Sequence, residues 1–545
     1  MSLQFILGGA GSGKANFLYR KICEEAAKNP KKRFFVLVPE QFTLETQKTL
    51  VKLSPGHGIM NIDVLSFNRL AYRVFEEFPA LKKTILEDMG KTMVLQKILS
   101  QEKRNLHYFG RGIEKPGFLD ELKSFLCELY VYRIDDEGME TMISAAESGS
   151  LTECKLKDLQ LIYRAFRKRL SDEYMTAEEI LPQLSKVAKE VEMLRGAVFA
   201  FTGFTGFTPV QYELLTELLR VSEKMYITLD ADGRGKREEL FRLTFDTMKT
   251  MGKICREIKI TPEEPIILGA GTDRASLRFP KGSALSFLER NLFDKETFFY
   301  EKPQQEISIT EIKDLKSEAD FVVRKIWWLV AKEGYRYQDI AIVTGDLAAY
   351  QDYLSAGFES RNIRYFLDYK KSIGGNAFSE FILSFLEMLR KDMDYESTIR
   401  FLRCGLSPLN LEETDRIENV ILALGKRGFY SYDKEWTAPY HEKERYDMDK
   451  VNAAREKFID MIREPRNAFA GGKKCVRDYV EILYDFIVRN EIYDRLKKKV
   501  AFFEERGEVL LAKEYKSVYQ VMMNLFDQMV ELLGDEPVSF ACLLY

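Results

Sequence analysis

The first thirty residues change from one hydrophobic period to another. Residues 3–7 form a short apolar run, glycines follow, and apolar side chains then recur at Phe17, Leu18, Ile22 and Ala26. A continuous run is typical of a buried strand, whereas spacings of three and four mark one face of a helix. We therefore predict a strand, a glycine-rich loop and a helix that packs back on the strand.

The same alternation continues to about residue 83. Apolar runs at 33–38 and 62–65 predict two further strands, and helical patterns cover 44–53 and 68–78. Nearly continuous apolar runs are expected of parallel strands that are covered on both faces. The order strand–helix–strand–helix–strand indicates the start of a doubly wound parallel sheet.

Between residues 84 and 195 the pattern is helical and contains no convincing strand. Sheet signals then return at 197–201 and 224–229, on either side of a predicted helix at 209–219. We interpret 84–195 as a helical domain inserted into a sheet domain formed by 1–83 plus 196–280. The helices predicted within the insertion cover 89–102, 117–130, 156–171 and 177–192.

The second half of the chain repeats this organisation. Residues 262–304 are rich in Pro, Gly and charge and predict a connection, with the linker itself at 281–304. A second α/β domain is predicted at 305–400, followed by a second helical insertion at 401–545. An apolar turn without a cap at 540–545 leads us to expect that the polypeptide is longer than this chain. The second domain's predicted elements are strands at 307–312, 340–344 and 365–367 and a helix at 315–332.

The glycine-rich loop after the first strand carries candidate chemistry. It fits the pattern G-x-x-x-x-G-K, but alanine follows where Ser or Thr is usual. Backbone N–H groups and the helix dipole would bind phosphate, and the lysine would add a mobile charge. The missing hydroxyl normally holds Mg²⁺, so we expect ATP binding, doubtful Mg²⁺ binding and slow hydrolysis. A glycine-rich turn without a ligand is the alternative. The candidate nucleotide-binding residues are Gly8, Gly9, Ala10, Gly11, Ser12, Gly13, Lys14 and Ala15.

Composition narrows the class of protein. The chain has 545 residues, 46% hydrophobic and 31% charged, and a net charge of −3, which is ordinary for a globular protein of about three or four domains. No apolar run approaches the roughly 18 residues of a membrane helix. The seven cysteines are scattered, without a C-x-x-C pair, so we expect reduced thiols and a cytoplasmic protein. The three histidines are far apart in sequence, which argues against histidine-based catalysis.

Two α/β domains, each interrupted by a helical insertion, resemble the core of superfamily 1 helicases. Specific strings are closer to the AddB family, the B subunits of bacterial AddAB ATP-dependent helicase–nucleases. These strings keep their order and spacing along the whole chain. They are 8–14, 37–43 (LVPEQFT), 66–71 (SFNRLA), 115–118 (KPGF), 203–209 (GFTGFTP), 318–321 (EADF), 339–343 (DIAIV) and 363–368 (IRYFLD).

This resemblance implies a helicase-like subunit that does not translocate. It implies an AddA partner, a role in double-strand break repair by homologous recombination, and scanning of single-stranded DNA for the Chi sequence. It also implies a nuclease domain and a [4Fe–4S] cluster in the later half of the full-length protein, outside this chain. No catalytic residue and no metal site is expected in this stretch.

Two positions depart from the family pattern. Ala15 replaces Ser or Thr, and Thr202 follows the strand at 197–201 where family members commonly have Asp. In a helicase fold an acidic residue at that strand end would organise Mg²⁺ and its water. Asp230, after the strand at 224–229, is a candidate substitute.

Ligands of open parallel sheets bind beyond the carboxyl ends of the strands. Segments that leave such ends supply aromatic rings, hydrogen-bonding side chains and one arginine. Bases stack on aromatic rings, and arginine reads guanine edges, each with about 1–3 kcal/mol. The alternative is that the aromatic residues only pack helices on the sheet. The candidate DNA-binding residues are Gln41, Thr43, Phe67, Arg69, Tyr72, Phe204 and Phe207, of which all but Phe204 match positions that the family uses for Chi.

Three functions remain open from the sequence. The first is a nucleotide-binding, DNA-scanning subunit of a helicase–nuclease. The second is an active P-loop ATPase or helicase, and the third is a helical scaffold that docks a motor subunit. Rates of ATP turnover and salt-dependent DNA binding would separate them.

Overall fold

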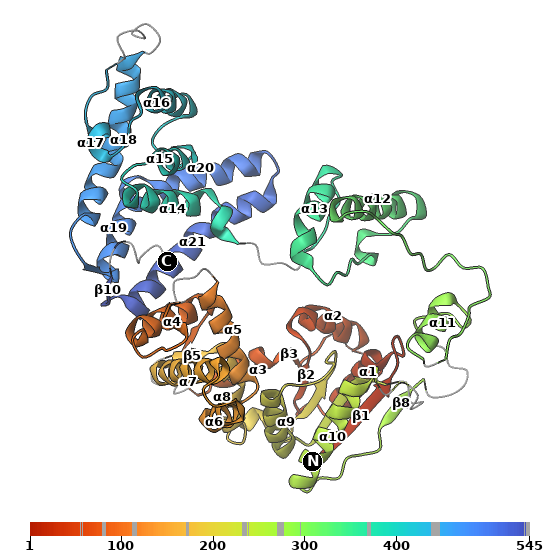
Figure 1. The fold of residues 1–545 in the computed structure, drawn as a ribbon. Helices are drawn as coiled ribbons and strands as arrows, with labels where there is room; N and C mark the ends of the chain where they lie inside the picture. The colour runs from red at the N-terminus through yellow and green to blue at the C-terminus, as the bar shows by residue number, and fades with distance from the viewer. Residues whose placement is uncertain are drawn as a thin grey trace. The chain divides into compact units, whose positions relative to one another are not determined.

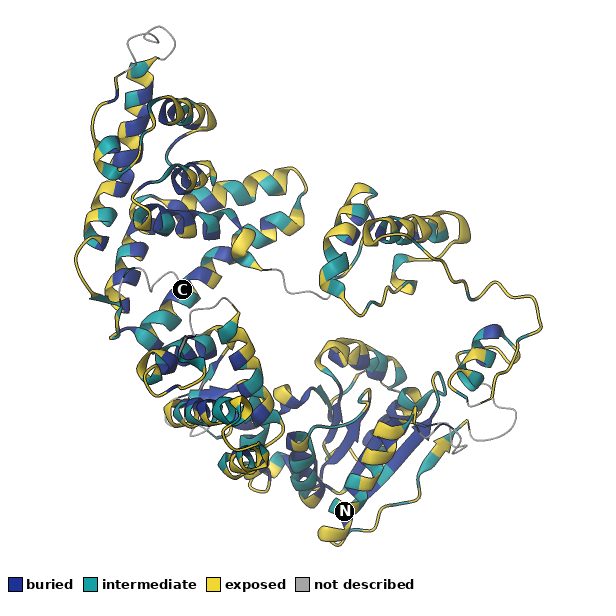
Figure 2. Ribbon diagram, viewed as in Figure 1, coloured by how far each residue is buried: buried dark blue, intermediate teal, exposed yellow. Residues whose placement is uncertain are grey.

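The computed structural model of the chain divides into two compact units, Met1–Ser308 and Ile309–Tyr545. Figure 1 traces the chain through both units, and Figure 2 shows which parts of each are buried. The division after Ser308 lies close to the predicted start of the second α/β domain at 305. The structure describes residues 1–54, 56, 58–78, 83–111, 117–170, 174–231, 237, 239–269, 277–294, 296–367, 372–437, 447–538 and 540.

A six-stranded sheet organises the first unit. Its order is β3-β2-β6-β7-β1-β8, and every ladder in it is parallel. The five strands predicted for the sheet domain are confirmed, as is the α/β class. The strands are β1 (Ser2–Gly8), β2 (Phe34–Leu37), β3 (Ile62–Leu65), β6 (Val198–Phe201), β7 (Lys224–Asp230) and β8 (Ile266–Leu268).

Helices cover both faces of this sheet because alternate strand residues point to opposite sides. Phe35 and Leu37 of β2 belong to one buried cluster with the helices α3, α8 and α9. Phe34 and Val36 belong to the other, with α1 and α2. Apolar residues on both faces explain the continuous runs that predicted these strands. The helices are α1 (Lys14–Lys28), α2 (Thr43–Leu53), α3 (Phe67–Phe75), α8 (Ile180–Val187), α9 (Pro209–Val221) and α10 (Arg242–Glu257), and a 3-10 turn, η1 (Glu40–Phe42), precedes α2.

The insertion at 84–195 is mainly helical, as predicted, but the absence of strands there was a wrong prediction. Two strands of three residues, β4 (Thr84–Leu86) and β5 (Tyr174–Thr176), pair in parallel across the insertion. Such short strands carry too few residues for a period of two. The helix predicted at 177–192 is also shorter, since α8 ends at Val187. The other elements are α4 (Asp88–Glu102), α5 (Phe118–Val131), α6 (Asp136–Ala145), α7 (Leu151–Leu170) and the 3-10 turns Phe109–Arg111, Ala177–Glu179 and Glu192–Leu194.

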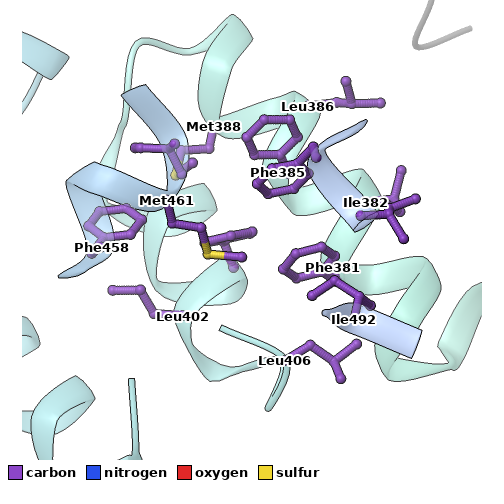
Figure 3. Close-up of a cluster of buried hydrophobic side chains, with 14 of the residues drawn as sticks. Phe381, Ile382, Phe385, Leu386, Met388, Leu402, Leu406, Phe458, Met461 and Ile492 are labelled. Carbon is purple, nitrogen blue, oxygen red and sulfur yellow. The ribbon is translucent and has the colours of Figure 1, made fainter. Parts of the chain in front are cut away.

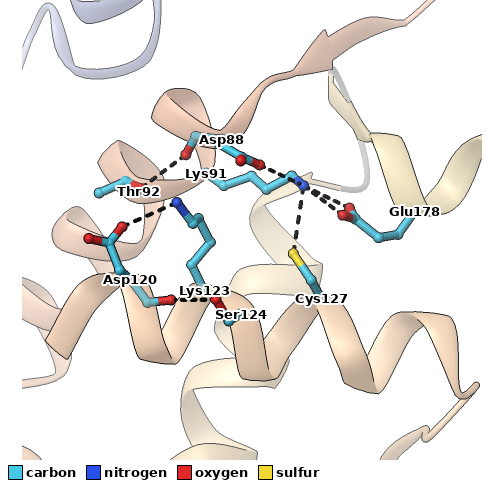
Figure 4. A network of polar contacts seen from close by, with 8 residues as sticks. All are labelled: Asp88, Lys91, Thr92, Asp120, Lys123, Ser124, Cys127 and Glu178. Carbon is cyan, nitrogen blue, oxygen red and sulfur yellow. Dashed lines mark hydrogen bonds and ion pairs between the residues drawn. The ribbon is translucent and has the colours of Figure 1, made fainter. Parts of the chain in front are cut away.

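A buried ion pair joins the helices of the insertion (Figure 4). Lys91 Nζ donates to both carboxylate oxygens of Glu178, at 2.8 and 2.9 Å, and lies 3.6 Å from Cys127 Sγ. Burial raises the pKa of the Cys127 thiol to about 11. Burial also raises the pKa of Glu178, but the hydrogen bond and charge of Lys91 outweigh it, so the pKa lies below its ordinary value. The pair therefore stabilises the fold at neutral pH, and Glu178's contribution is lost as the pH falls through its lowered pKa.

The region predicted as a connection, 262–304, contains regular structure. Strand β8 pairs with β1 as the edge of the sheet, and helix α11 (Ala284–Asn291) lies within the predicted linker. A strand of three residues among prolines and charges gives little periodic signal. Both elements belong to the first unit.

The second unit begins with two helices, α12 (Leu315–Glu333) and α13 (Leu347–Ser360), which pack through Val323, Ile326 and Phe358. The strands predicted at 307–312, 340–344 and 365–367 are not formed. Among the described residues these segments have no neighbouring strand, and Val343 is 93% exposed. The apolar pattern was present, but a strand also requires a partner for its backbone hydrogen bonds. Asp368 of the predicted string lies outside the described residues. Two 3-10 turns, Tyr337–Asp339 and Ile373–Gly375, occur beside these helices.

The rest of the second unit is helical, as predicted, around an aromatic core. Figure 3 shows part of this core, including Phe381 and Phe385. Each of these two rings stacks on the ring of Phe486. Residues 541–545, where we predicted an uncapped end, lie outside the described residues. Within the part of the chain that the structure describes, no helix has the length and hydropathy needed to cross a bilayer. The elements are α14 (Ala377–Arg390), α15 (Tyr395–Arg403), α16 (Leu411–Leu424), α17 (Phe429–Asp433), α18 (Met448–Phe469), α19 (Val476–Arg489), α20 (Ile492–Glu505), α21 (Val509–Leu533) and an antiparallel pair, β9 (Lys474–Cys475) and β10 (Pro537–Val538).

Candidate nucleotide and nucleic-acid site

The glycine-rich loop leaves the carboxyl end of β1 and enters α1. Gly13 caps α1 with φ +83°, a left-handed conformation that favours glycine. A Cβ there would also lie 2.8 Å from Leu277 Cδ1. The strand–loop–helix arrangement predicted from the sequence is present, and the start of α1 directs backbone N–H groups and the positive end of the helix dipole at the loop.

Lys14 is held inside the loop. Its Nζ donates to the carbonyl oxygens of Gly8 and Gly9, at 2.8 and 3.0 Å, and forms an ion pair with Asp230 Oδ1 at 2.6 Å. Only 15% of the Lys14 side chain is exposed. Asp230 ends β7 directly opposite Gly8 in the parallel register. The fold therefore brings the one acidic residue that the sequence offered as a substitute into contact with the loop lysine.

The loop also contains an unsatisfied donor. Ser12 Oγ is buried and has no hydrogen-bond partner. Its side chain lies against the α-carbon of Gly8, where a Cβ would collide with it. An amine, an unpaired hydroxyl and loop N–H groups are the groups that a polyphosphate requires. The residues present thus fit the phosphates of a nucleotide.

Residues from the end of the unit cover this loop. The N–H of Arg278 donates to Gly11 O at 3.3 Å. On α11, the Glu289 carboxylate oxygen Oε1 lies 2.8 Å from where a Cβ on Gly9 would be. Arg237 donates to the carbonyl oxygen of Glu289 at 2.7 Å and keeps α11 in place. A carboxylate beside a phosphate loop repels an anionic ligand.

The two positions that usually serve Mg²⁺ supply no free oxygen. Ala15 has no hydroxyl, and the hydroxyl of Thr202 is buried and shares a hydrogen bond of 2.9 Å with Thr228 Oγ1. Within the described residues, no three His, Cys, Asp or Glu side chains are placed to hold a metal ion together. The residues at these positions do not fit a helicase-type Mg²⁺ site.

Three aromatic residues of the predicted DNA-binding set come together. The ring of Phe67 lies 5.3 Å from that of Phe204 and 6.4 Å from that of Phe207, and the last two are 5.4 Å apart. Phe67 is only 6% exposed, so it supports the cluster from below. Phe204 and Phe207 are half-buried and form the outer part of the cluster.

The polar members of the set surround η1 and α3. Arg69 Nε forms an ion pair of 2.7 Å with Glu40 Oε1, and 56% of the arginine side chain is exposed. Thr43 is buried, and its hydroxyl donates to Glu40 O. Gln41 and Tyr72 are exposed. Arg69 and Tyr72, three residues apart, share one side of α3.

The order of the strands separates the two candidate sites. The aromatic and polar set follows β2, β3 and β6, which are neighbours, whereas the phosphate loop follows β1, with β7 between β1 and β6. At Gly203, φ +83°, the loop after β6 passes so close to the loop after β2 that a Cβ would lie 3.2 Å from Pro39 Cδ. All these segments leave the same edge of the sheet, as predicted from parallel topology.

Sequence reasoning missed three residues. Glu40 pairs with Arg69, Glu289 lies against Gly9, and Phe42 is exposed at the approach to Gly203. Glu40 and Phe42 stand inside the 37–43 string, beside residues that were selected. Glu289 lies in the predicted linker, and no sequence signal connects it with the loop.

The fold defines an α/β protein with a parallel sheet, a glycine-rich loop between its first strand and helix, and a helical insertion. Residues 5–289 match the family model described as ADDB, N-terminal. The chain belongs to the AddB family, which confirms the resemblance inferred from the strings. Of the residues in these strings, 115–116 and 368 lie outside the described residues.

Three relatives are each named as the B subunit of an ATP-dependent helicase/deoxyribonuclease. The chain is 38% identical over 544 residues to that of Lachnoclostridium phytofermentans, covering 98% of this chain and 47% of the relative. It is 33% identical over 550 residues to that of Caldanaerobacter subterraneus subsp. tengcongensis and 32% over 554 residues to that of Thermoanaerobacter sp. strain X514, each covering 99% of this chain and 47% of the relative. The chain thus spans about half the length of these relatives.

Proposed function

We propose that the chain is the N-terminal part of a helicase–exonuclease subunit that acts in double-strand break repair by homologous recombination. Its candidate groove, at the carboxyl ends of β2, β3 and β6, binds single-stranded DNA and scans it for Chi. One observation carries this proposal: exposed Arg69 and Tyr72 lie on α3, and the first residue of that helix, Phe67, packs against Phe204 and Phe207. A cation and aromatic faces are what base reading and base stacking require.

The phosphate loop has a separate role in this proposal. Lys14, Ser12 and the loop N–H groups hold ATP, whose triphosphate supplies the negative charge that the amine would otherwise find in Asp230. Slow hydrolysis follows because Ala15 has no hydroxyl and the buried Thr202 hydroxyl is hydrogen-bonded to Thr228, so neither position offers a carboxylate or a free hydroxyl to Mg²⁺.

The proposal extends to the whole protein. An AddA-type subunit supplies the motor, and the nuclease domain with its [4Fe–4S] cluster lies in the half of the relatives' length that this chain does not span. Chromosomal DNA as the substrate places the complex in the cytoplasm.

Selection from a random pool of single-stranded DNA tests the groove. The full-length complex should enrich one short sequence, and Arg69→Ala and Phe207→Ala should relax that preference by about 5–150-fold, from about 1–3 kcal/mol per contact. Binding of random sequence should change little in Arg69→Ala, whereas Phe207→Ala, which also removes a stacking ring, should weaken it as well. Arg73→Ala is the matched control, because this arginine of α3 pairs with Asp63 at 2.7 Å and not with Glu40. Unchanged discrimination in both test variants would refute the groove.

A second candidate function is an active ATPase. The contact of Asp230 with Lys14 favours it, since a carboxylate beside the loop is where a helicase places its acidic group. DNA-stimulated turnover of about 1 s⁻¹ or more, abolished by Asp230→Asn in this subunit, would establish this alternative.

A further inference from the structure

Helix α12 of the second unit presents aromatic rings to solvent on the side away from its core. Ala319, Val323 and Ile326 pack inward against α13. Phe321 and Trp328 are both exposed and are seven residues apart, so they share the opposite side of the helix, about 10 Å apart along its axis. Among the described residues, neither ring belongs to the buried cluster that joins α12 and α13.

The tryptophans make this surface unusual for the chain. It has three, of which Trp436 is buried, whereas Trp327 and Trp328 are 48% and 41% exposed. Exposed clusters of large aromatic side chains mark sites of interaction. Because consecutive helix residues point about 100° apart, Trp327 lies to one side of this surface. We call Phe321, Arg324, Lys325, Trp328 and Lys332 the α12 aromatic face.

Cations accompany the rings along this face. Arg324 and Lys325 fall between Phe321 and Trp328 on the helix, and Lys332 follows one turn later. The Lys325 amine lies 4.6 Å from the centroid of the Trp328 ring. Arg324 has an exposed ion pair of 3.0 Å with Asp320, which contributes little in water. Glu318, the other acid of this part of α12, receives a hydrogen bond from Tyr350 of α13.

We propose that the α12 aromatic face is a second contact for single-stranded nucleic acid. Rings with flanking cations match a ligand that has stackable bases and an anionic backbone. The charge complementarity favours this ligand over a protein surface, which would need acidic groups opposite three exposed cations. The inference depends on the proposed function, because it assumes that DNA reaches this subunit, and it adds a site remote in sequence from the groove residues.

Ultraviolet cross-linking locates such a contact directly. The full-length complex is irradiated with an oligo(dT) probe and digested with trypsin, which cuts after Lys325 and Lys332. The peptide 326–332, which contains both exposed tryptophans, should carry a thymidine adduct. Competition by excess unlabelled oligo(dT) should remove the adduct.

Variants test separately the aromatic rings and the cations of the α12 aromatic face. Phe321→Ala with Trp328→Ala should lower the affinity of oligo(dT) for this subunit on the order of tenfold, and Trp328→Phe should retain most of it. Arg324→Gln with Lys325→Gln should reduce the slope of log affinity against log salt by about 0.7 for each cation removed. Tyr430→Ala is the matched control: this exposed tyrosine of α17 also has a lysine amine over its ring, at 3.7 Å, but Asp433 and Glu435 stand beside it.

Three outcomes would contradict the proposed nucleic-acid contact on α12. A complex that binds no oligo(dT) refutes both this site and the proposed function. Normal binding, with an unchanged salt slope in the variants and no adduct on 326–332, overturns the α12 site alone. Loss of the partner subunit from the double variants, with DNA binding intact, overturns it in favour of a protein interface.

Discussion

Two clusters of charged side chains lie beyond the carboxyl ends of the strands of one sheet. They differ in how many internal partners each charge has and in how much of each side chain is exposed to solvent. On the β7–β1–β8 side, Lys14 is 15% exposed and held by Asp230 and two carbonyl groups, with Glu289 beside the loop. On the β3–β2–β6 side, Arg69 and Glu40 form a pair in which both side chains are more than half exposed. A ligand must displace internal contacts at the first cluster, whereas at the second it meets groups that water already reaches.

This difference predicts different energetics at the two clusters. A nucleotide has to replace Asp230 as the partner of Lys14 and to move the Glu289 carboxylate away from Gly9. These two existing contacts lower the affinity of the loop for a nucleotide. DNA that binds at the proposed groove would break one exposed ion pair, which is worth about 0–1 kcal/mol. We therefore expect little internal cost for DNA binding at the groove and a larger internal cost for nucleotide binding at the loop.

The largest effect is expected for Lys14→Ala. Removing a charge-assisted hydrogen bond costs about 1.5–3 kcal/mol, so ATP affinity should fall about 10–100-fold. Photolabelling with azido-ATP, quantified on the band of this subunit, separates its nucleotide from that of a partner motor. Lys28→Ala, at the exposed end of α1, is the control. Equal labelling of parent and Lys14→Ala would show that this loop does not hold the nucleotide.

Tyr72→Ala should affect only the other cluster. The loss of one exposed stacking ring should lower single-stranded DNA affinity about tenfold, while azido-ATP labelling stays at the parent level. Cross-linking yield as a function of DNA concentration provides the affinity, and Tyr132→Ala, exposed in the insertion, provides the control. A parallel fall in nucleotide labelling would mean that the two clusters form one site and would remove the contrast between them.

The two clusters were predictable to different degrees, and the reason is where their parts lie in the sequence. The glycine-rich loop is recognised from eight consecutive residues, and Asp230 is found because it follows a predicted strand. Glu289 is some 280 residues from Gly9 and lies in a stretch without periodicity, so only the folded chain reveals the contact. Glu40 was visible within its string, but nothing in the sequence pairs it with Arg69.

The fold shows the same limit. Strands of the first sheet are buried on both faces, so their apolar runs were sufficient evidence. At 340–344 the pattern is equally apolar, yet Ile342 and Val343 are exposed and no strand lies beside them in the described residues. Side-chain pattern predicts burial, whereas a strand is defined by hydrogen bonds to a neighbour.

Glu289→Gln tests whether the negative charge of Glu289 weakens nucleotide binding at the glycine-rich loop. The variant keeps the side chain's size and its polar contact with Arg237 but removes a negative charge next to Gly9. Two unit charges about 4 Å apart interact by about 1 kcal/mol in water, so ATP labelling should tighten about fivefold. Glu257→Gln, exposed at the end of α10, should change nothing. If the affinity for azido-ATP falls instead, Glu289 helps to bind the nucleotide, and its charge does not weaken nucleotide binding.

The smallest effect is expected from restoring the missing hydroxyl with Ala15→Thr. Ala15 is the second residue of α1, where the Ser or Thr of a phosphate loop ordinarily meets Mg²⁺. In the parent, azido-ATP labelling should be nearly the same with Mg²⁺ and with a chelator. The variant should label about threefold more tightly with Mg²⁺, the size of one hydrogen-bond-strength contact. Ala15→Val has nearly the same shape without the oxygen, so it separates metal ligation from side-chain volume. If azido-ATP labelling of the parent depends strongly on Mg²⁺, a carboxylate must bind the metal. Asp230 would then have to leave Lys14 and bind Mg²⁺, as the acidic residue of an active motor does.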